Sequence, residues 1–167
     1  QWPQKEGLEI AACYLPHDRI GGDYYDLIPL NTYEYIFCIA DVSGKGIPAA
    51  LLMSHIQATL HTLCQYTHNL KDITLEINKR VIQQTRYQKF VSFFLGKINM
   101  RSQQLTYINA GHNPPLLVYD SKTLLLDQGC PLLGISDQLM HHMDVKMIHY
   151  SGSFRLLCYT EIGRAHV

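Results

Sequence analysis

Two short acidic motifs, separated by one apolar run, contain the residues of this chain best suited to chemistry. Asp23 follows two glycines, and Asp41 comes directly after the apolar run 35–40 and shortly before Gly44. An ionised carboxylate at the end of a buried strand is costly unless a partner compensates it, and a divalent cation is a strong partner. Glycine beside each carboxylate lets the backbone approach a metal or a phosphate closely. The motifs therefore predict a hard-cation site facing a phosphate, with Asp23 and Asp41 as ligands.

The same two motifs also fit a structural role, because an Asp before Ser-Gly commonly caps a turn or a helix without binding a metal. If a metal binds, carboxylate donors favour Mg²⁺ or Mn²⁺ over zinc, which prefers His and Cys. The sequence Gly44-Lys45-Gly46 is not a phosphate-binding P-loop, because Ile39 stands where that motif needs glycine and Gly46 where it needs Ser or Thr. A helix opening at Ile47 can still present free backbone N–H groups to an anion.

His112 lies in the Gly- and Pro-containing segment 109–115, which is predicted to be a tight loop between two strands. Its imidazole can bind a phosphate or act as an acid. A structural role is the more common one for a histidine in such a turn. The remaining histidines have no ligand spacing, and no Ser/His/Asp or Cys/His grouping is apparent, so covalent catalysis gains no support.

Composition predicts one domain without a net charge that would attract a charged partner. The chain has 167 residues, 47% of them hydrophobic, and its 14 basic and 14 acidic side chains cancel. These values fit a single core and argue against nucleic acid or an anionic membrane as partner. The five cysteines are odd in number, which favours reduced core residues in a cytoplasmic protein. No apolar run approaches the ~20 residues that span a bilayer, although a parent protein could be membrane-anchored upstream.

The hydrophobic pattern predicts an α+β layered domain with mainly antiparallel pairing, since strands precede two helices and more strands follow. The third strand is uninterrupted and bulky, as expected of a strand buried on both faces. The helices are expected to begin near Pro48 and near Asn69. The expected strands are 8–15, 24–30, 35–40, 91–100, 105–110, 115–119, 123–126, 143–150 and 154–159.

Several motifs, in order along nearly the whole chain, resemble the SpoIIE/RsbU-type phosphatases, the bacterial branch of the PPM (protein phosphatase 2C-like) family. The resemblance implies a layered β-sandwich flanked by helices (α-β-β-α) and a binuclear Mn²⁺/Mg²⁺ centre. It implies that Asp23 and Asp41 are catalytic metal ligands, that Asp41 bridges both ions, and that the Val42 backbone carbonyl adds a ligand. The matching segments are 10–12, 21–26, 39–46, 48–53, 109–115 and 131–135.

The same resemblance implies an activity and partners. The expected reaction is metal-dependent hydrolysis of a phosphoserine or phosphothreonine on a regulatory protein of the anti-anti-sigma-factor type in bacterial signalling. Two cations would activate a water molecule for direct attack on phosphorus. An upstream sensor or regulatory domain is expected in the parent protein. The alternative is a non-catalytic PPM-like module for signalling or phosphoprotein binding, and a nucleotide-binding domain is disfavoured because its diagnostic glycines are absent.

The chain departs from the family after Tyr159-Thr160, where the family continues with an Asp-Gly metal ligand. Here Glu161 and Ile162 follow, so the carboxylate at this position lacks the adjacent glycine, and the run 161–167 looks like the translation of a sequencing adapter. We therefore expect a phosphatase domain over residues 1–160 that is incomplete at its C-terminus, followed by a non-native tail over 161–167. Activity of this fragment alone is expected to be impaired, because part of the metal shell would be missing.

Overall fold

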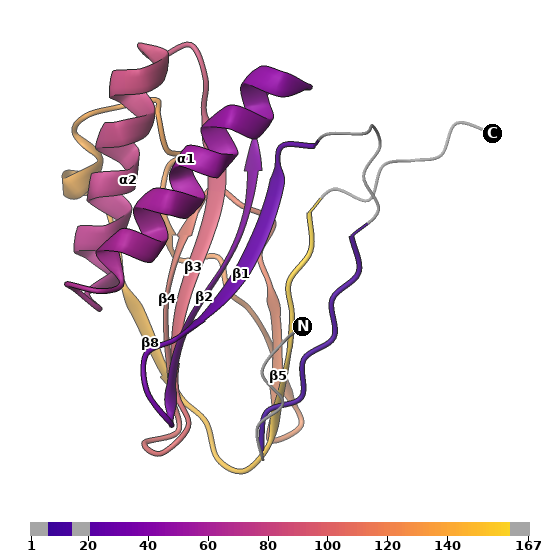
Figure 1. Cartoon of the computed structure of the whole chain (residues 1–167). Coiled ribbons are helices and arrows are strands. Elements are labelled where there is room, and N and C mark those ends of the chain that lie inside the picture. The colour runs from indigo at the N-terminus through magenta and orange to yellow at the C-terminus, as the bar shows by residue number, and fades with distance from the viewer. Residues whose placement is uncertain (1–6, 15–20, 161–167) are drawn as a thin grey trace.

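The computed structural model describes residues 7–14 and 21–160, which form two β-sheets and a pair of helices (Figure 1). The two α-helices follow two strands, where the sequence predicts three, and the remaining strands follow the helices, as the sequence predicts. The elements are β1 Asp23–Pro29, β2 Glu34–Val42, α1 Ile47–Leu63, α2 Leu70–Thr85, β3 Val91–Asn99, β4 Gln104–Ala110, β5 Leu116–Tyr119, β6 Lys122–Leu125, β7 Gly129–Cys130, η1 Leu139–His142, β8 Lys146–His149 and β9 Phe154–Leu157.

The two sheets are stacked in layers, and both helices cover the same face of the larger sheet (Figure 1). The larger sheet has the strand order β1-β2-β3-β4-β7, with β8 also paired to β4. The smaller sheet has the order β6-β5-β9. All pairings are antiparallel except the parallel pair of β4 and β7. The prediction of an α+β domain with mainly antiparallel sheets is therefore confirmed.

Side-chain alternation along the central strands divides the core into two clusters. Residues paired in register point to the same face of a sheet, and successive residues point to opposite faces. Tyr24, Ala40 and Phe93 belong to the cluster beneath the helices. Their neighbours Ile39 and Phe94 belong to the cluster between the two sheets. The strand β2 is buried on both faces, as its bulky sequence predicts.

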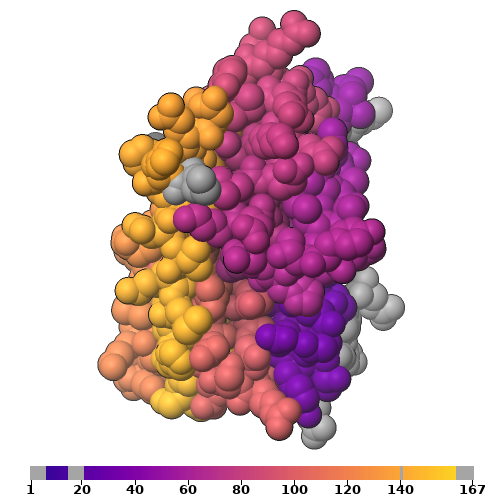
Figure 2. Space-filling model, turned by 90° about the vertical axis from the view of Figure 1, so that its left-hand side faces the viewer, coloured from indigo at the N-terminus to yellow at the C-terminus, as the bar shows by residue number. Residues whose placement is uncertain are grey.

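The helix pair begins where the sequence predicts. In α1, Pro48 occupies the first turn, where its missing N–H costs nothing. In α2, the Asn69 side chain accepts hydrogen bonds from the backbone N–H groups of Lys71 and Asp72. Figure 2 shows the face on which η1 packs beside α2. Within the described residues, neither helix is both long and apolar enough to cross a membrane.

Three details differ from the sequence-based expectations. Residues 9–14 form no strand, although Leu8 packs against the cluster between the sheets; Leu15 lies outside the described residues. The segment expected over 143–150 is a strand only over Lys146–His149, where it pairs with β4. The short strand β7 was not expected. In each case, whether the segment forms a strand depends on hydrogen-bond partners from distant parts of the chain, and these cannot be predicted from local apolar content. An α-β-β-α arrangement was expected, with helices on both outer faces. Within the described ranges, both α-helices lie on one face of the larger sheet, and no α-helix covers the smaller sheet.

Candidate divalent-cation site

The two carboxylates predicted from sequence lie directly opposite each other. Asp23, the first residue of β1, pairs in register with Asp41 near the end of β2, and Asp41 pairs in turn with Ser92 of β3. The side chains of a register row share one face, here the face toward the second sheet, because the next residues along each strand face the helices. Asp23, Asp41 and Ser92 therefore form a polar row at one end of the larger sheet.

The pairing type brings the two carboxylates close together. The Val42 N–H donates to the Gly22 carbonyl at 3.3 Å, so Gly22 and Val42 form a hydrogen-bonded pair. The adjacent pair, Asp23 with Asp41, is then of the non-hydrogen-bonded kind, in which side chains approach more closely. A hydrogen bond with the Asp41 side chain also acts on Asp23. The structure thus brings together the two residues that the sequence motifs singled out.

Burial perturbs the protonation of this pair. Desolvation raises the pKa of the Asp23 carboxyl above its ordinary value, and the hydrogen bond with Asp41 partly opposes that rise. Two close, partly buried carboxyls disfavour a double negative charge unless a proton or a cation neutralises them. Their oxygens are the donors that hard divalent cations prefer. The chemistry of the donor set therefore fits Mg²⁺ or Mn²⁺.

Gly22, directly before β1, allows the chain to pass close to the Val42 carbonyl, next to Asp41. A Cβ atom added at Gly22 would lie 3.1 Å from the Val42 carbonyl oxygen and 3.5 Å from the Ala49 side chain. A side chain there would crowd the carbonyl that the family resemblance assigns as a metal ligand. Val42 itself is buried, with its side chain in the cluster beneath α1 and α2. Its assignment as a ligand through the carbonyl remains a prediction.

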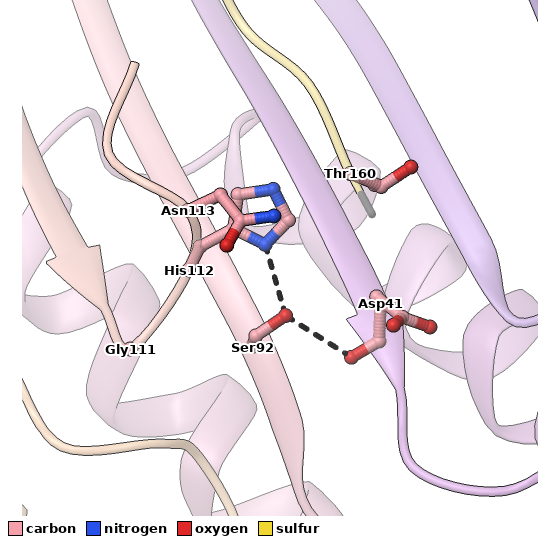
Figure 3. A pocket seen from close by; sticks show the side chains of 6 residues that line it. All are labelled: Asp41, Ser92, Gly111, His112, Asn113 and Thr160. Carbon is pink, nitrogen blue, oxygen red and sulfur yellow. Dashed lines mark hydrogen bonds between the residues drawn. The ribbon is translucent and has the colours of Figure 1, made fainter. Parts of the chain in front are cut away.

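A pocket of about 170 Å³ opens beside Asp41 (Figure 3). Its wall includes Ser92 from β3, Thr160 after β9, and the loop that follows β4. In that loop His112 is buried, and its Nδ1 lies 2.9 Å from the Ser92 hydroxyl oxygen. The Ser92 hydroxyl also donates to the Asp41 backbone carbonyl at 3.5 Å. His112, for which a structural role was the commoner expectation, is thus part of the wall of the site.

Asn109 shapes the loop that holds His112. Its side-chain carbonyl accepts from the His112 N–H at 2.7 Å, and its amide donates to the His112 and Leu126 carbonyls at 3.0 and 2.9 Å. Gly111 adopts φ 67°, a left-handed conformation that favours glycine. The sequence 109–112 therefore folds as one hydrogen-bonded unit that presents the imidazole to Ser92.

Burial keeps the His112 ring neutral. Desolvation lowers the pKa of His112 to about 4, although the nearby Tyr159 backbone acts in the opposite direction. Nε2 makes no hydrogen bond within the described residues. Sequence inspection missed Ser92; the available signal was a polar residue within the otherwise apolar run 91–95. Within residues 7–14 and 21–160 no third His, Cys, Asp or Glu converges with a pair to form a metal cluster. Glu161, the carboxylate that stands where the family has its Asp, lies outside the described residues.

Comparison with known proteins establishes the family. The family described as "Stage II sporulation protein E (SpoIIE)" matches residues 31–161, which is most of the chain. This chain belongs to the SpoIIE family. The match spans β2, both helices and the loop with His112, so it includes Asp41 and the pocket wall but begins after Asp23.

Relatives of the SpoIIE-family chain include two proteins of Bacillus subtilis (strain 168). It is 37% identical to phosphoserine phosphatase RsbU over 112 residues, covering 67% of this chain and 33% of RsbU. It is 28% identical to phosphoserine phosphatase RsbP over 163 residues, covering 92% of this chain and 39% of RsbP. The chain thus spans between about a third and two fifths of the length of these relatives.

Solved structures show the same fold. The crystal structure of the RsbU and RsbW domains of Rv1364c from Mycobacterium tuberculosis matches with a TM-score of 0.73 and 24% identity, covering 87% of this chain and 40% of that chain. RsbX in complex with magnesium matches with a TM-score of 0.69 and 18% identity, covering 84% of this chain and 66% of that one. At these identities the likeness establishes the PP2C-type fold.

Proposed function

We propose that this chain supplies Asp23, Asp41 and the Val42 carbonyl to the divalent-cation site of a protein serine/threonine phosphatase. The single observation that supports this most strongly is the register pairing of Asp23 with Asp41 on one face of the sheet. Membership of the SpoIIE family and the names of RsbU and RsbP as phosphoserine phosphatases support the same reaction class.

The proposed roles follow from the chemistry of each group. Asp23 and Asp41 would hold Mn²⁺ or Mg²⁺, with Asp41 shared between two ions, and the Val42 carbonyl would complete part of the shell. Bound divalent cations activate water and neutralise the charge that develops on a phosphoryl group. The pocket beside Asp41 offers room at that site for a small anionic group, and its remaining wall is polar and uncharged at Ser92, Asn113 and Thr160.

We further propose that the substrate is a phosphoserine or phosphothreonine on a regulatory protein of the anti-anti-sigma-factor type, in a pathway controlling a sigma factor. Similarity to RsbU and RsbP supports this substrate class. An upstream sensor or regulatory domain would control the activity. The formal charge of the chain, with 14 basic and 14 acidic side chains, fits a protein substrate better than nucleic acid.

The direct test measures phosphate release from a serine-phosphorylated regulatory protein by the complete gene product that contains this chain. We expect release with Mn²⁺ or Mg²⁺, none after chelation with EDTA, and recovery when the metal is restored. The Asp41→Asn variant should fail under all conditions, while Asp137→Asn, which changes an exposed carboxylate, should behave as wild type.

The alternative is a non-catalytic PPM-like module that binds a phosphoprotein. The absence of a third converging ligand within the described residues is the observation that keeps this alternative relevant. Retention of the phosphoprotein without any metal-dependent release of phosphate, in the complete gene product, would establish the alternative and contradict the proposed phosphatase.

A further inference from the structure

His112 is buried although it lies in a loop. The residue is 5% exposed, and its Nε2 atom has no hydrogen-bond partner at bonding geometry within the described part of the chain, although the Tyr159 backbone acts on the ring and opposes the lowering of its pKa by burial. Leaving a buried polar atom unpaired costs about 1–3 kcal/mol, so such an atom requires an explanation. The other ring nitrogen, Nδ1, lies 2.9 Å from the Ser92 hydroxyl, next to Asp41 (Figure 3).

Ser92 connects this imidazole to the backbone of Asp41. Its hydroxyl oxygen lies 3.5 Å from the Asp41 carbonyl oxygen and 2.9 Å from His112 Nδ1. A serine hydroxyl has one proton to donate and lone pairs that accept. Both contacts are hydrogen bonds together only when Nδ1 donates to Ser92 and the Ser92 proton is directed at Asp41. The ring tautomer of His112 and the Asp41 backbone are thereby linked through one hydroxyl.

The peptide unit between Asp41 and Val42 is held from both sides. On the β1 side the Val42 N–H donates to the Gly22 carbonyl at 3.3 Å. On the β3 side Asp41 and Ser92 form a hydrogen-bonded backbone pair, two residues from the pair in which the Ser43 N–H donates to the Phe90 carbonyl. The Ser92 hydroxyl adds a further contact, 3.5 Å from the Asp41 carbonyl oxygen. Because a peptide unit is planar, fixing its N–H and its C=O fixes the orientation of the whole group. That group contains the Asp41 carbonyl carbon and the Val42 nitrogen. Its orientation therefore affects the direction in which the Asp41 side chain and the Val42 carbonyl point.

We propose that Ser92 and His112 are positioning residues that fix the Asp41–Val42 peptide unit, and with it the ligand atoms of the cation site. This inference rests on the proposed function, because it takes Asp41 and Val42 as ligands. Groups that orient metal ligands contribute strongly to affinity, and their loss typically weakens metal binding by about 10–100-fold. Neither residue needs to touch the cation or the substrate.

The geometry selects informative variants. Ser92→Ala removes the bridge, whereas Ser92→Thr retains the hydroxyl. His112→Asn keeps a polar atom near the position of Nδ1, whereas His112→Gln places its amide nearer the position of Nε2. Thr74→Val is a matched control, because it removes a buried hydroxyl that donates to a backbone carbonyl at 2.7 Å in α2, outside the pocket.

The first measurement is NMR of this chain without metal. We expect Ser92→Ala to shift the Asp41 carbonyl ¹³C and Val42 amide resonances, and Thr74→Val to leave them unchanged. Long-range ¹H–¹⁵N spectra should show the His112 proton on Nδ1. Unchanged Asp41 and Val42 resonances in Ser92→Ala, or a His112 proton on Nε2 with Nδ1 accepting from Ser92, would overturn the proposal.

The second measurement is Mn²⁺ affinity of the complete gene product by calorimetry. Ser92→Ala and His112→Gln should weaken binding by about tenfold, while Ser92→Thr and His112→Asn stay closer to wild type. Equal affinity in wild type and Ser92→Ala would contradict a positioning role. Should wild type bind no Mn²⁺ or Mg²⁺ while the Asp41 resonances still respond to Ser92→Ala, the metal-dependent function would fail and the Ser92–Asp41 link would stand.

Discussion

Asp23 and Asp41 face each other across the antiparallel pair of β1 and β2, on the side of the sheet that packs toward the second sheet. Each is partly buried, and they share a hydrogen bond. The arrangement concentrates negative charge where the fold cannot fully hydrate it. A site of this kind costs stability in the absence of a counter-ion and recovers it when a cation binds.

We predict that Asp23→Asn stabilises the metal-free chain at neutral pH. Because burial raises the pKa of Asp23 in the folded state, folding favours the protonated form. Stability is therefore highest below the unfolded pKa and declines as the pH rises through the folded pKa. Urea unfolding in EDTA should give a larger free energy of unfolding for Asp23→Asn than for wild type at pH 7, and no difference at pH 3.

The control for that measurement is Asp137→Asn, which alters an exposed carboxyl. It should leave the free energy of unfolding close to wild type at both pH values. A loss of stability in Asp23→Asn at pH 7 would contradict the assignment of Asp23 as a desolvated, destabilising carboxylate.

His112 should make the stability of the chain depend on pH in a separate window. Its folded pKa of about 4 lies below the ordinary value of 6.5, so between these values the unfolded chain binds more protons. The free energy of unfolding should fall as the pH drops from 6.5 to 4, by at most about 3 kcal/mol. His112→Gln should reduce this slope, whereas His55→Gln, at an exposed position in α1, should not. Equal slopes in all three proteins would show that His112 does not stay neutral on folding.

Gly129 is predicted to be intolerant of a side chain. A Cβ atom there would fall well inside van der Waals contact with the backbone carbonyl oxygen and nitrogen of Asn109. Gly129→Ala must separate β7 from β4, at a cost of about 1–3 kcal/mol or more in unfolding free energy. Gly152→Ala is a contrasting variant, because no atom lies within 4 Å of the added Cβ and its cost comes only from a φ of 66°, which is strained for alanine. If chemical denaturation finds Gly129→Ala as stable as wild type, the close approach at Gly129 is wrong.

The cysteines offer a test of the layered core. Cys13 is exposed, whereas Cys38 and Cys64 are buried, and burial raises the pKa of the Cys64 thiol to about 11. Because the thiolate is the reactive form, iodoacetamide at pH 8 should modify Cys13 first. Peptide mass spectrometry should find Cys38 and Cys64 modified only in urea. Early modification of Cys38 would contradict the packing of β2 beneath α1.

Local sequence was sufficient for part of this structure. The bulky run 35–40 predicts a buried strand ending at Asp41, and Pro48 and Asn69 mark the starts of α1 and α2. The mostly apolar run 8–15 also resembled a strand, but residues 9–14 have no strand pairing, and Leu15 lies outside the described residues. A strand requires a neighbour, and its identity depends on how distant segments meet.

The contacts between the residues of the site depend on tertiary arrangement and could not be predicted from the motifs. Each Asp was identifiable from its glycine neighbours, but their register pairing was not, since a one-residue slip would have placed Asp23 on the opposite face. The link between Ser92 and His112 joins residues twenty positions apart through the fold of the 109–112 loop. No spacing rule reports such a contact.

The central claim is that Asp23 and Asp41 hold the cation on which phosphate release depends. Its most direct test is the rate of release from a phosphoserine protein as a function of Mn²⁺ concentration, measured for the complete gene product and its Asp23→Asn variant. We expect Asp23→Asn to require at least about tenfold more Mn²⁺ for half-maximal rate, in line with the loss of a charged ligand. An unchanged Mn²⁺ requirement, with release at the wild-type rate, would contradict the claim.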